Sequence, residues 1–559
     1  MTPPDRATTR EPSGPRDERF QRLAGAALDE ALALHPDMAT ELGDHRFDDR
    51  LPDGRPEALD EERRMLDARL RELEALDLVT LLPDNRVDTE ILGAALRARR
   101  YELDVLREHE WNPLVANPAG AVYTLLAREF APLAERLRSL AGRLAAVPES
   151  LEVARRTLHD MPRVHLETVI GQFAGAEGLI GQEVDAALEA EPALRPEVDA
   201  VRPAALRAVE EHRRWLADRL DSLDRPGPDP RIGPERFARK LAHTLDAAAT
   251  ADEILARAEA DLVRVEEEIA RTASRLEGDG AAGPEVVRKV LDRLAEDRPD
   301  DTTILDLCRR ALEGVTGFVR EHDLVTVYDD PIEIIEMPEF NRGVAVAYCD
   351  PPGPLEPAPL PTFFAVSPTP GDWPPERVLS FYREYNAHMI HNLTVHEAMP
   401  GHALQLAHAR RFSAPTRVRD ALWSGPLVEG WAVYVERVAA ENGYQGDALR
   451  MQQLKMQLRM VINAILDARV HAHGMTEGEA MRLMMERGHQ EEGEATGKWR
   501  RALLSSTQLS TYFVGYVEVS DLAADLRAAT PGVTDRVLHD ELLAHGSPPP
   551  RHLRTLVGL

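Results

Sequence analysis

The sequence predicts a mainly helical protein with a small β-sheet, and two patterns carry this fold class. Apolar residues recur at helical spacing from residue 18 to about residue 224, and again from residue 375 to the end of the chain. Between these stretches, short β-branched segments bounded by turn residues predict strands. Because 559 residues exceed what one hydrophobic core usually fills, we expect two lobes around a deep cleft.

The boundary between the lobes is predicted at a segment rich in Pro and Gly. Residues 225–234, RPGPDPRIGP, contain four Pro and favour a linker. We therefore expect a helical lobe at residues 18–224 and a second lobe at residues 235–559. The first 17 residues are polar and Pro-rich, which predicts a disordered N-terminus, residues 1–17.

The predicted sheet lies inside the second lobe, at about residues 324–368. Four segments carry the strand pattern: LVTVYDD, PIEIIEM, GVAVAYCDPP and TFFAVSP. Helices follow over about residues 376–520, so we expect the sheet to lie beside the first of them.

Composition argues against several classes of partner and location. The chain has 67 Lys and Arg against 96 Asp and Glu, a net charge of -29, which disfavours nucleic-acid and anionic-membrane partners. Cys308 and Cys349 are too few for a disulfide framework. No apolar run of about 18 residues and no apolar N-terminal segment occurs, so we expect a cytoplasmic protein. The oligomeric state is not encoded in any pattern that we find.

The most informative motif is VHEAMPGH, residues 395–402. It is close to the zinc-peptidase motif H-E-x-x-H, in which two His lie one helical turn apart and the Glu acts as general base. Here His402 follows His396 by six residues instead of four. On a regular helix this spacing leaves the two side chains roughly 120° apart, too far round to share a tetrahedral ion.

Pro400 and Gly401 give a physical reason for the helix to be distorted. Pro removes a backbone donor and clashes with the preceding turn, and Gly accepts strained backbone dihedrals. A break between Ala398 and His402 would bring His402 back beside His396. An unbroken helix would instead exclude His402 from any shared metal site.

A third ligand is expected in LVEGWAVYVERV, where Glu429 stands 27 residues after His402. Glu429 and Glu436 are seven residues apart and share one helix face, so one could bind the metal while the other holds a ligand in place. Their neighbours are nearly all apolar, and a buried carboxylate needs a partner. From these residues alone we expect His396, His402 and one of these two carboxylates to bind a metal ion.

Together the two motifs resemble a known family. HEAMPGH followed by EGWAVYVE is similar to a bacterial domain-of-unknown-function family of predicted zinc metallopeptidases, whose members carry HEAxPGH and EGWAxYxE. The resemblance runs from ELGDHR, residues 41–46, into the C-terminal third of the chain. It implies a two-lobed, zincin-like helical fold with zinc as cofactor and a peptide as substrate.

Two further segments are similar to the family pattern. DARVHAHGMT, residues 467–476, resembles DTGIHxxGWT, and RALLSSTQLSTYFVG, residues 501–515, resembles RYxxxPGQALxYxxG. In the second segment Ser506 and Thr507 replace Pro-Gly, a departure that bears on the loop shape and not on the zinc site.

These segments supply candidates for the remaining roles of a metallopeptidase. The oxyanion of the tetrahedral intermediate gains from a second donor, for which His471 and Tyr512 are the candidates. Asp467 stands four residues before His471 and could fix its tautomer if the stretch is helical. Arg501 could pair with a substrate carboxylate.

The predicted sheet offers a way to hold a peptide. An exposed edge strand can bind an extended peptide by β-augmentation. We predict that TFFAVSP, residues 362–368, is that edge, which makes Phe363 and Phe364 substrate-binding residues. The alternative, that this strand only closes the hydrophobic floor of the lobe, fits the sequence equally well.

The predicted function is zinc-dependent hydrolysis of peptide bonds, with short peptides as substrates. We predict that His396, His402 and Glu429 bind Zn²⁺, with Glu436 in support. Glu397 lies about 100° round the helix from His396, so it would face the attacking water, take its proton and pass it to the leaving amine. Two alternatives stay open. One is a non-catalytic helical scaffold with a vestigial metal site, and the other is a zinc hydrolase of non-peptide amides or esters.

Overall fold

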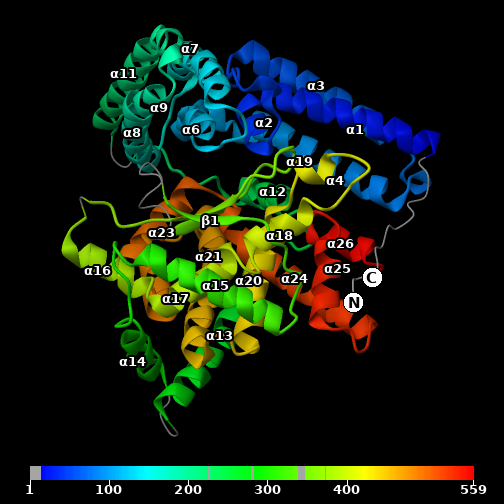
Figure 1. The fold of residues 1–559 in the computed structure, drawn as a ribbon, viewed down its shortest axis with the longest axis vertical. Helices are drawn as coiled ribbons and strands as arrows, with labels where there is room; N and C mark the ends of the chain where they lie inside the picture. Colours follow the sequence, from blue (N-terminus) through cyan, green and yellow to red (C-terminus); the bar gives the residue numbers. More distant parts are fainter. Residues whose placement is uncertain (1–13, 225–226, 279–282, 338–345, 372) are drawn as a thin grey trace.

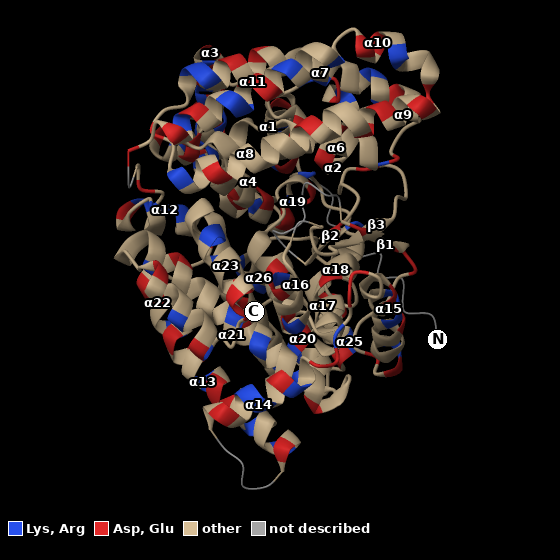
Figure 2. Ribbon diagram, turned by 90° about the vertical axis from the view of Figure 1, so that its left-hand side faces the viewer, with Lys and Arg blue, Asp and Glu red and all other residues tan. Residues whose placement is uncertain are grey.

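The computed structural model describes residues 14–224, 227–278, 283–337, 346–371 and 373–559, and it confirms the fold class. The chain is mainly helical with one three-stranded sheet among the described residues. In both ribbon views the N-terminal helices lie above the sheet and the C-terminal helices form the body below it (Figure 1, Figure 2). No described helix is both long and apolar enough to span a membrane.

The N-terminal part packs its helices into two hydrophobic cores. One core surrounds Phe20 and includes Val418, which arrives from the C-terminal half of the chain, and the other surrounds Phe173. The first core therefore ties the two halves together. The helices are α1 (Pro15–Leu34), α2 (Pro36–Leu42), α3 (Pro56–Glu74), α4 (Pro83–Tyr101), α5 (Glu108–Trp111), α6 (Ala119–Ala127), α7 (Leu133–Thr157), α8 (Arg163–Gly178), α9 (Val184–Ala190), α10 (Arg195–Asp199) and α11 (Arg202–Asp221).

The C-terminal part shares one large core that runs from Phe237 to Leu553. Its helices are α12 (Pro234–Leu245), α13 (Ala251–Glu277), α14 (Pro284–Leu294), α15 (Ile304–Glu321), α16 (Pro375–Glu384), α17 (Ala387–Glu397), α18 (His402–Ala409), α19 (Val418–Ala421), α20 (Gly425–Glu441), α21 (Gly446–His473), α22 (Glu477–Arg482), α23 (Glu492–Leu504), α24 (Gln508–Ala529), α25 (Asp535–Leu543) and α26 (Pro550–Leu556).

The structure bears on parts of two predicted segments, the N-terminus and the linker. Helix α1 begins at Pro15, so residues 15–17, expected to be disordered, are helical, while residues 1–13 lie outside the described part. No helix covers residues 227–233, which belong to the predicted linker, and residues 225 and 226 are not described.

The sheet has the order β1-β3-β2, with β1 (Ile332–Glu336) parallel and β2 (Ala347–Asp350) antiparallel to β3 (Thr362–Val366). The prediction that residues 362–368 form an edge strand is therefore wrong, because β3 is paired on both sides. The edges are β1 and β2, and β2 is the edge beside the motif helix.

The first predicted strand segment, residues 324–330, is not a strand. Its polar backbone groups bond to side chains instead: the carboxylate of Asp540 accepts from the N–H of Thr326 at 2.8 Å, and the imidazole of His408 donates to the Thr326 carbonyl at 2.8 Å. A β-branched pattern predicts a strand only where a neighbouring strand is available.

The upper helices meet the sheet through Arg128, which lies just after α6. Its guanidinium carbon is 4.1 Å from the centre of the Phe363 ring, and it donates to the carbonyl of Pro361 at 3.0 Å. Nearby, the loop at Gly353 touches the ELGDHR segment so closely that a Cβ on Gly353 would lie 2.5 Å from the Gly43 nitrogen. A Cβ on Gly43, inside that segment, would likewise lie 2.4 Å from the backbone nitrogen of Glu356, and Gly43 has φ 88°, so this close approach requires Gly on both sides.

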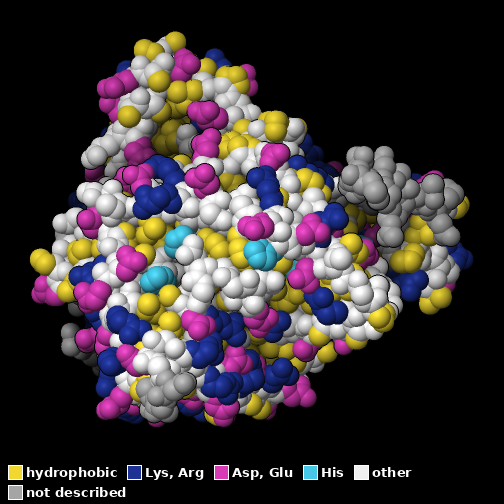
Figure 3. Space-filling view, turned by 60° about the horizontal axis from the view of Figure 1, so that its bottom comes forward, with side chains coloured by type: hydrophobic (Ala, Val, Ile, Leu, Met, Phe, Trp, Pro, Cys, Tyr) yellow, Lys and Arg dark blue, Asp and Glu magenta, His cyan; other side chains and the backbone are white. Residues whose placement is uncertain are grey.

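The surface mixes charges of both signs. On the face shown in Figure 3, basic and acidic side chains are interspersed, so the acidic excess is not gathered into one patch there.

Candidate metal centre

The motif helix breaks in the interval that the sequence predicts. Helix α17 ends at Glu397 and α18 begins at His402. The N–H groups of Met399 and Gly401 donate to carbonyl oxygens five and six residues back, at 3.1 and 2.9 Å, in place of the regular four. The wider turn absorbs the extra residues between the two His.

Gly401 and Trp431 hold this break in place. A Cβ on Gly401 would lie 1.8 Å from the carbonyl oxygen of His396, so the backbone passes where only Gly fits. The indole nitrogen of Trp431, which is fully buried on α20, donates to the carbonyl of Pro400 at 2.9 Å. The Trp of EGWA therefore fixes the shape of HEAMPGH, which gives a physical reason for the two motifs to occur together.

The break brings the three predicted ligands together. The imidazole rings of His396 and His402 are nearly perpendicular, with centres 4.7 Å apart. One carboxylate oxygen of Glu429, on α20, lies 3.5 Å from the Nε2 atom of each His. The candidate ligand atoms of the three residues all lie within 4.8 Å of one another.

Glu436 orients one of these ligands. Its carboxylate accepts from Nδ1 of His396 at 2.7 Å and from the side-chain amide of Asn392 at 2.6 Å. With its Nδ1 donating to a carboxylate, the neutral His396 ring keeps its Nε2 lone pair free on the side of Glu429. This geometry is the one required by the role predicted for Glu436.

Burial and mutual contact perturb the site electrostatically. Burial by itself would lower the pKa of His396, but the neighbouring carboxylates of Glu429 and Glu436 raise the pKa well above its ordinary value. Burial would raise the pKa of Glu429, yet the two imidazoles lower it strongly. The metal-free site thus favours a proton where a metal ion would otherwise supply the positive charge.

The residues present fit a divalent metal ion. Two buried atoms of the site have no hydrogen-bond partner among the described residues: Oε2 of Glu429, which faces both imidazoles, and Nδ1 of His402. A buried carboxylate oxygen without a donor is costly unless a cation meets it. Two His nitrogens and one carboxylate oxygen also form the donor set of catalytic zinc sites that keep a fourth position open.

Glu397 lies between the ligands and the sheet. Its carboxylate accepts the backbone N–H of Cys349, on β2, at 3.0 Å, and burial raises the pKa of this carboxyl above its ordinary value. A raised pKa suits a group that must take and release a proton.

Tyr512 and Arg501 lie close enough to the candidate centre for the charge of Glu429 to act on both. The Tyr512 hydroxyl accepts from Arg501 at 3.3 Å and from the amide of Gln508 at 3.2 Å. Burial and the negative charge of Glu429 raise the pKa of Tyr512 to about 12, so the hydroxyl keeps its proton at neutral pH.

A close crossing of two helices places Tyr512 near Glu429. Helices α20 and α24 touch at Gly430 and Gly515, where a Cβ on Gly515 would lie 2.0 Å from the carbonyl oxygen of Pro426. Glu429 and Tyr512 stand next to this contact on their own helices, which explains why the Gly of the last family segment matters.

His471 and Asp467 are placed differently from the expectation. Nε2 of His471 donates to the carbonyls of Ala502 and Ser505 at 2.8 and 3.0 Å, and its ring stacks on Phe237. Its Nδ1 has no partner among the described residues, so no hydrogen bond joins it to Asp467. The Nε2–H group of His471, which was expected to stabilise an oxyanion, is therefore already hydrogen-bonded at the end of α23.

Asp467 instead holds the start of α24. Its carboxylate accepts from the N–H of Thr507 at 2.8 Å and from the N–H and hydroxyl of Ser510 at 3.0 and 2.7 Å. Thr507, which replaces the family Gly, adopts a left-handed conformation with φ 71°. The loop shape that Gly would favour is thus kept by a Thr whose N–H is tied to Asp467.

The two Phe predicted to bind substrate lie on opposite faces of the sheet. Phe364 is 1% exposed inside the core of the C-terminal part, so its predicted role is wrong. Phe363 faces Arg128 and remains half-buried, which leaves its role untested.

The sequence motifs do not predict a role for Lys498. It is buried on α23 and lines a pocket together with Arg501, three residues later. A signal was present, because the chain contains only four Lys among its 67 basic residues. A Lys kept in a chain that otherwise uses Arg was a candidate for a specific role.

Comparison with known proteins places the chain in a family without assigning an activity. Residues 36–557 match the model described as "Bacterial protein of unknown function (DUF885)", and the chain belongs to this family. No curated protein matches it.

Solved structures of similar fold include two bacterial proteins. A candidate lipoprotein of unknown function from Shewanella oneidensis is 28% identical with a TM-score of 0.81, covering 96% of this chain and 99% of that one. A candidate lipoprotein from Colwellia psychrerythraea is 16% identical with a TM-score of 0.79, covering 97% and 98%. An M32 carboxypeptidase from Deinococcus radiodurans R1, at 13% identity and a TM-score of 0.34 over 97% and 98%, is too distant to inform fold or function.

Proposed function

We propose that this protein is a zinc-dependent peptidase. The observation that carries the proposal is the convergence of His396, His402 and Glu429, with the Glu429 oxygen facing both imidazoles without a hydrogen-bond donor. Glu397 directly follows one ligand, and it is buried beside the free edge of the sheet. This set combines a metal-binding triangle with a general base, which a purely structural metal site does not need.

A bound zinc ion would polarise the scissile carbonyl and an attacking water. The chain's own groups supply the remaining steps. Glu397 accepts the proton of the water and delivers it to the leaving amine, a task for which its raised pKa is suited. The Tyr512 hydroxyl keeps its proton and can donate to the developing oxyanion, while Arg501 orients that hydroxyl.

The edge of β2 supports a peptide as the substrate. In its antiparallel pairing with β3, the backbone groups of Tyr348 and Asp350 point to β3, whereas those of Ala347 and Cys349 point outward. The outward N–H of Cys349 reaches Glu397. An extended peptide added along this edge would therefore run past the general base.

The test is the hydrolysis of a mixed peptide library by zinc-loaded protein, followed by mass spectrometry. We expect Glu397→Gln to keep its zinc and lose activity by about 10²- to 10⁴-fold, because it removes only the proton transfer. Glu333→Gln, which changes an exposed carboxylate of the same sheet, is the matched control and should retain full activity.

Two results would contradict the proposal. If wild-type protein holds stoichiometric zinc but cleaves no peptide, the remaining interpretations are a non-catalytic scaffold and a hydrolase of other amides and esters. Equal cleavage by wild type and Glu397→Gln would remove the assigned base.

A further inference from the structure

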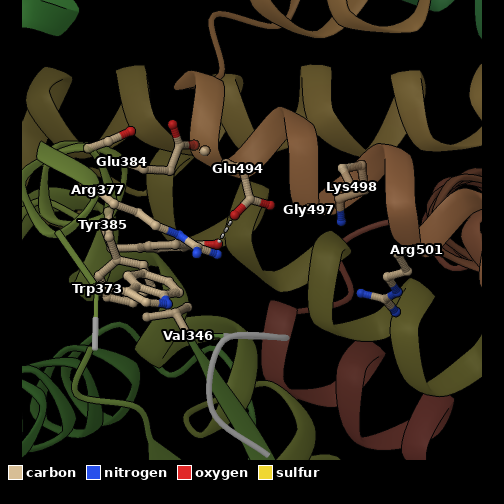
Figure 4. A pocket seen from close by; sticks show the side chains of 12 residues that line it. Val346, Trp373, Arg377, Glu384, Tyr385, Glu494, Gly497, Lys498 and Arg501 are labelled. Atoms are coloured by element: carbon tan, nitrogen blue, oxygen red, sulfur yellow. Dashed lines mark hydrogen bonds between the residues drawn. The ribbon is translucent and has the colours of Figure 1, made fainter. Parts of the chain in front are cut away.

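A pocket next to the metal centre contains two cations at one end. It lies between α16 and α23 and has a volume of about 650 Å³ including its open mouth. Trp373 and Tyr385 line one part, with Phe381 against both of their rings, and Lys498 and Arg501 lie toward the opposite end (Figure 4). Arg377 lies over the Trp373 ring, with its guanidinium carbon 3.8 Å from the ring centre. The pocket thus offers an aromatic wall and a positively charged end.

Neither cation has an acidic partner within the described part of the chain. Lys498 is 8% exposed and forms no hydrogen bond or ion pair there. Arg501 donates only to neutral groups, the amide oxygen of Gln508 at 2.8 Å and the hydroxyl of Tyr512 at 3.3 Å. Burial, together with the nearby Arg501 charge, lowers the pKa of Lys498 to about 7. Two adjacent unpaired cations in a buried position are costly unless an anion joins them.

The acids near the pocket are already paired with other groups. Glu494 accepts from the Tyr385 hydroxyl at 2.9 Å and lies 3.4 Å from Arg459. Glu384 binds the ammonium of Lys455 at 2.8 Å. Glu494 therefore acts on Lys498 and Arg501 only from beyond salt-bridge distance, and neither carboxylate forms an ion pair with these two cations.

The cations are connected to the metal centre. Arg501 lines the pocket and also bonds Tyr512, and the charge of Glu429 influences both of these side chains. A ligand whose anionic group met Lys498 and Arg501 would extend from the metal centre into the pocket.

We propose that Lys498 and Arg501 bind a carboxylate of the substrate, so that the protein selects peptides with a carboxylate close to the cleaved bond. This inference rests on the proposed peptidase function. Two sources supply the same chemistry, the C-terminal carboxylate of a short peptide and the side chain of Asp or Glu. The aromatic wall would contact the apolar part of the same residue.

Four peptides distinguish the sources. They share one sequence and combine a free or amidated C-terminus with Glu or Gln beside the cleaved bond. For the source that is used, we expect kcat/KM of zinc-loaded wild type to be roughly tenfold to a hundredfold higher with the carboxylate than with the amide, since charged hydrogen bonds have this strength. Equal rates for all four peptides would overturn the inference while leaving the peptidase function intact.

Two variants of buried lysines identify the binding group. Lys498→Met should reduce the preference to less than about threefold, mainly through KM, and should not lower the Tm, because it removes an unpaired buried charge. The matched control, Lys455→Met, breaks the buried pair with Glu384 and should lower the Tm while keeping the preference. A preference that survives in Lys498→Met would also overturn the inference.

A binding experiment decides the question even if no peptide is cleaved. Calorimetry with the zinc-loaded Glu397→Gln variant compares the same four peptides. The site is supported if a peptide with the carboxylate binds more tightly than its amide counterpart, and if this difference disappears when Lys498→Met is added to the variant. Equal affinity for the carboxylate peptide and its amide counterpart would reject the site. Absence of cleavage would then count against the proposed function alone.

Discussion

Two buried groups of His and carboxylate lie in the C-terminal part, and their hydrogen bonds differ completely. In the metal centre, Oε2 of Glu429 and Nδ1 of His402 have no partner among the described residues. At the junction of α21 and α24, the carboxylate of Asp467 accepts three hydrogen bonds and Nε2 of His471 donates to two carbonyls. Both groups match family motifs, so their residue types do not distinguish them.

This difference in hydrogen bonding shows how a ligand-binding group can be distinguished from a group that only stabilises the fold. A carboxylate saturated by backbone donors stabilises the loop that supplies them and has little left to offer a ligand. The buried oxygen of Glu429 has no hydrogen-bond partner among the described residues, and in the metal-free protein its negative charge is balanced by a proton on the neighbouring imidazoles. A divalent cation can replace that proton, which favours the candidate metal centre as the functional group of the two.

The largest expected effect is the loss of zinc from Glu429→Gln. Zinc affinity should fall on the order of 1,000-fold, about 4 kcal/mol, because one of three protein ligands is lost from a total of about 10–16 kcal/mol. Competition with a fluorescent chelator measures the affinity. Unchanged zinc affinity would mean that the unpaired oxygen of Glu429 is not a ligand. The distinction between a metal site and a structural network would then no longer hold.

Asp467→Asn should have the opposite pattern, with a loss of stability and no loss of metal. Replacing an acceptor of three buried hydrogen bonds should lower the free energy of unfolding by about 3 kcal/mol, measured by urea unfolding of the metal-free protein. Asp525→Asn, on the exposed face of α24 and paired with Arg554, is the control and should cost less than about 0.5 kcal/mol. Zinc loss in Asp467→Asn would place the junction within the metal centre after all.

Glu436→Gln sharpens the comparison inside the metal centre. It keeps all three ligands but weakens the acceptor that orients His396, so zinc affinity should fall by about 10- to 100-fold. Nitrogen NMR of the imidazoles should show a mixture of His396 tautomers in place of the Nδ1-protonated form. Full affinity with an unchanged tautomer would show that Glu436 only fills space.

His471→Gln should give the smallest effect, visible as a change in pH dependence. Burial lowers the pKa of His471, so below about pH 6.5 the unfolded chain binds a proton that the folded protein refuses. The contribution of His471 to stability is therefore present above that pH and is lost as the pH falls toward its folded pKa. Urea unfolding at pH 5, 6 and 7 should show a larger loss for the variant at pH 7 than at pH 5, by up to about 1.4 kcal/mol per pH unit. A constant difference would mean that His471 titrates normally.

The convergence of His396, His402 and Glu429 was predictable from the sequence because its causes are local. The six-residue spacing of the two His demanded a break, and Pro400 and Gly401 supplied it in the expected interval. The apolar neighbours of Glu429 indicated burial, which the structure confirms for α20. The helical class was predictable for the same reason, since periodicity reports one buried face at a time.

Other expectations failed where the outcome depended on distant partners. The segment at residues 324–330 has strand-like residues but bonds to side chains of α18 and α25. Residues 362–368 were predicted to form an edge strand, but β3 is the central strand of the sheet, because strand order is set by neighbours far along the chain. The cytoplasmic location remains a prediction, and the lipoprotein description belongs to the two similar structures.

By itself, the sequence determined the helical class, the break in the motif helix and which three residues converge at the candidate metal centre. Each follows from spacing, from Pro and Gly backbone chemistry and from apolar patterns, all of which act over a few turns. Only the tertiary structure decided that His471 and Asp467 hold a helix junction, that β2 is the edge beside Glu397 and that Lys498 forms no ion pair with any described residue. Whether a polar group is satisfied depends on which donors and acceptors the fold brings near it, and no local pattern contains that information.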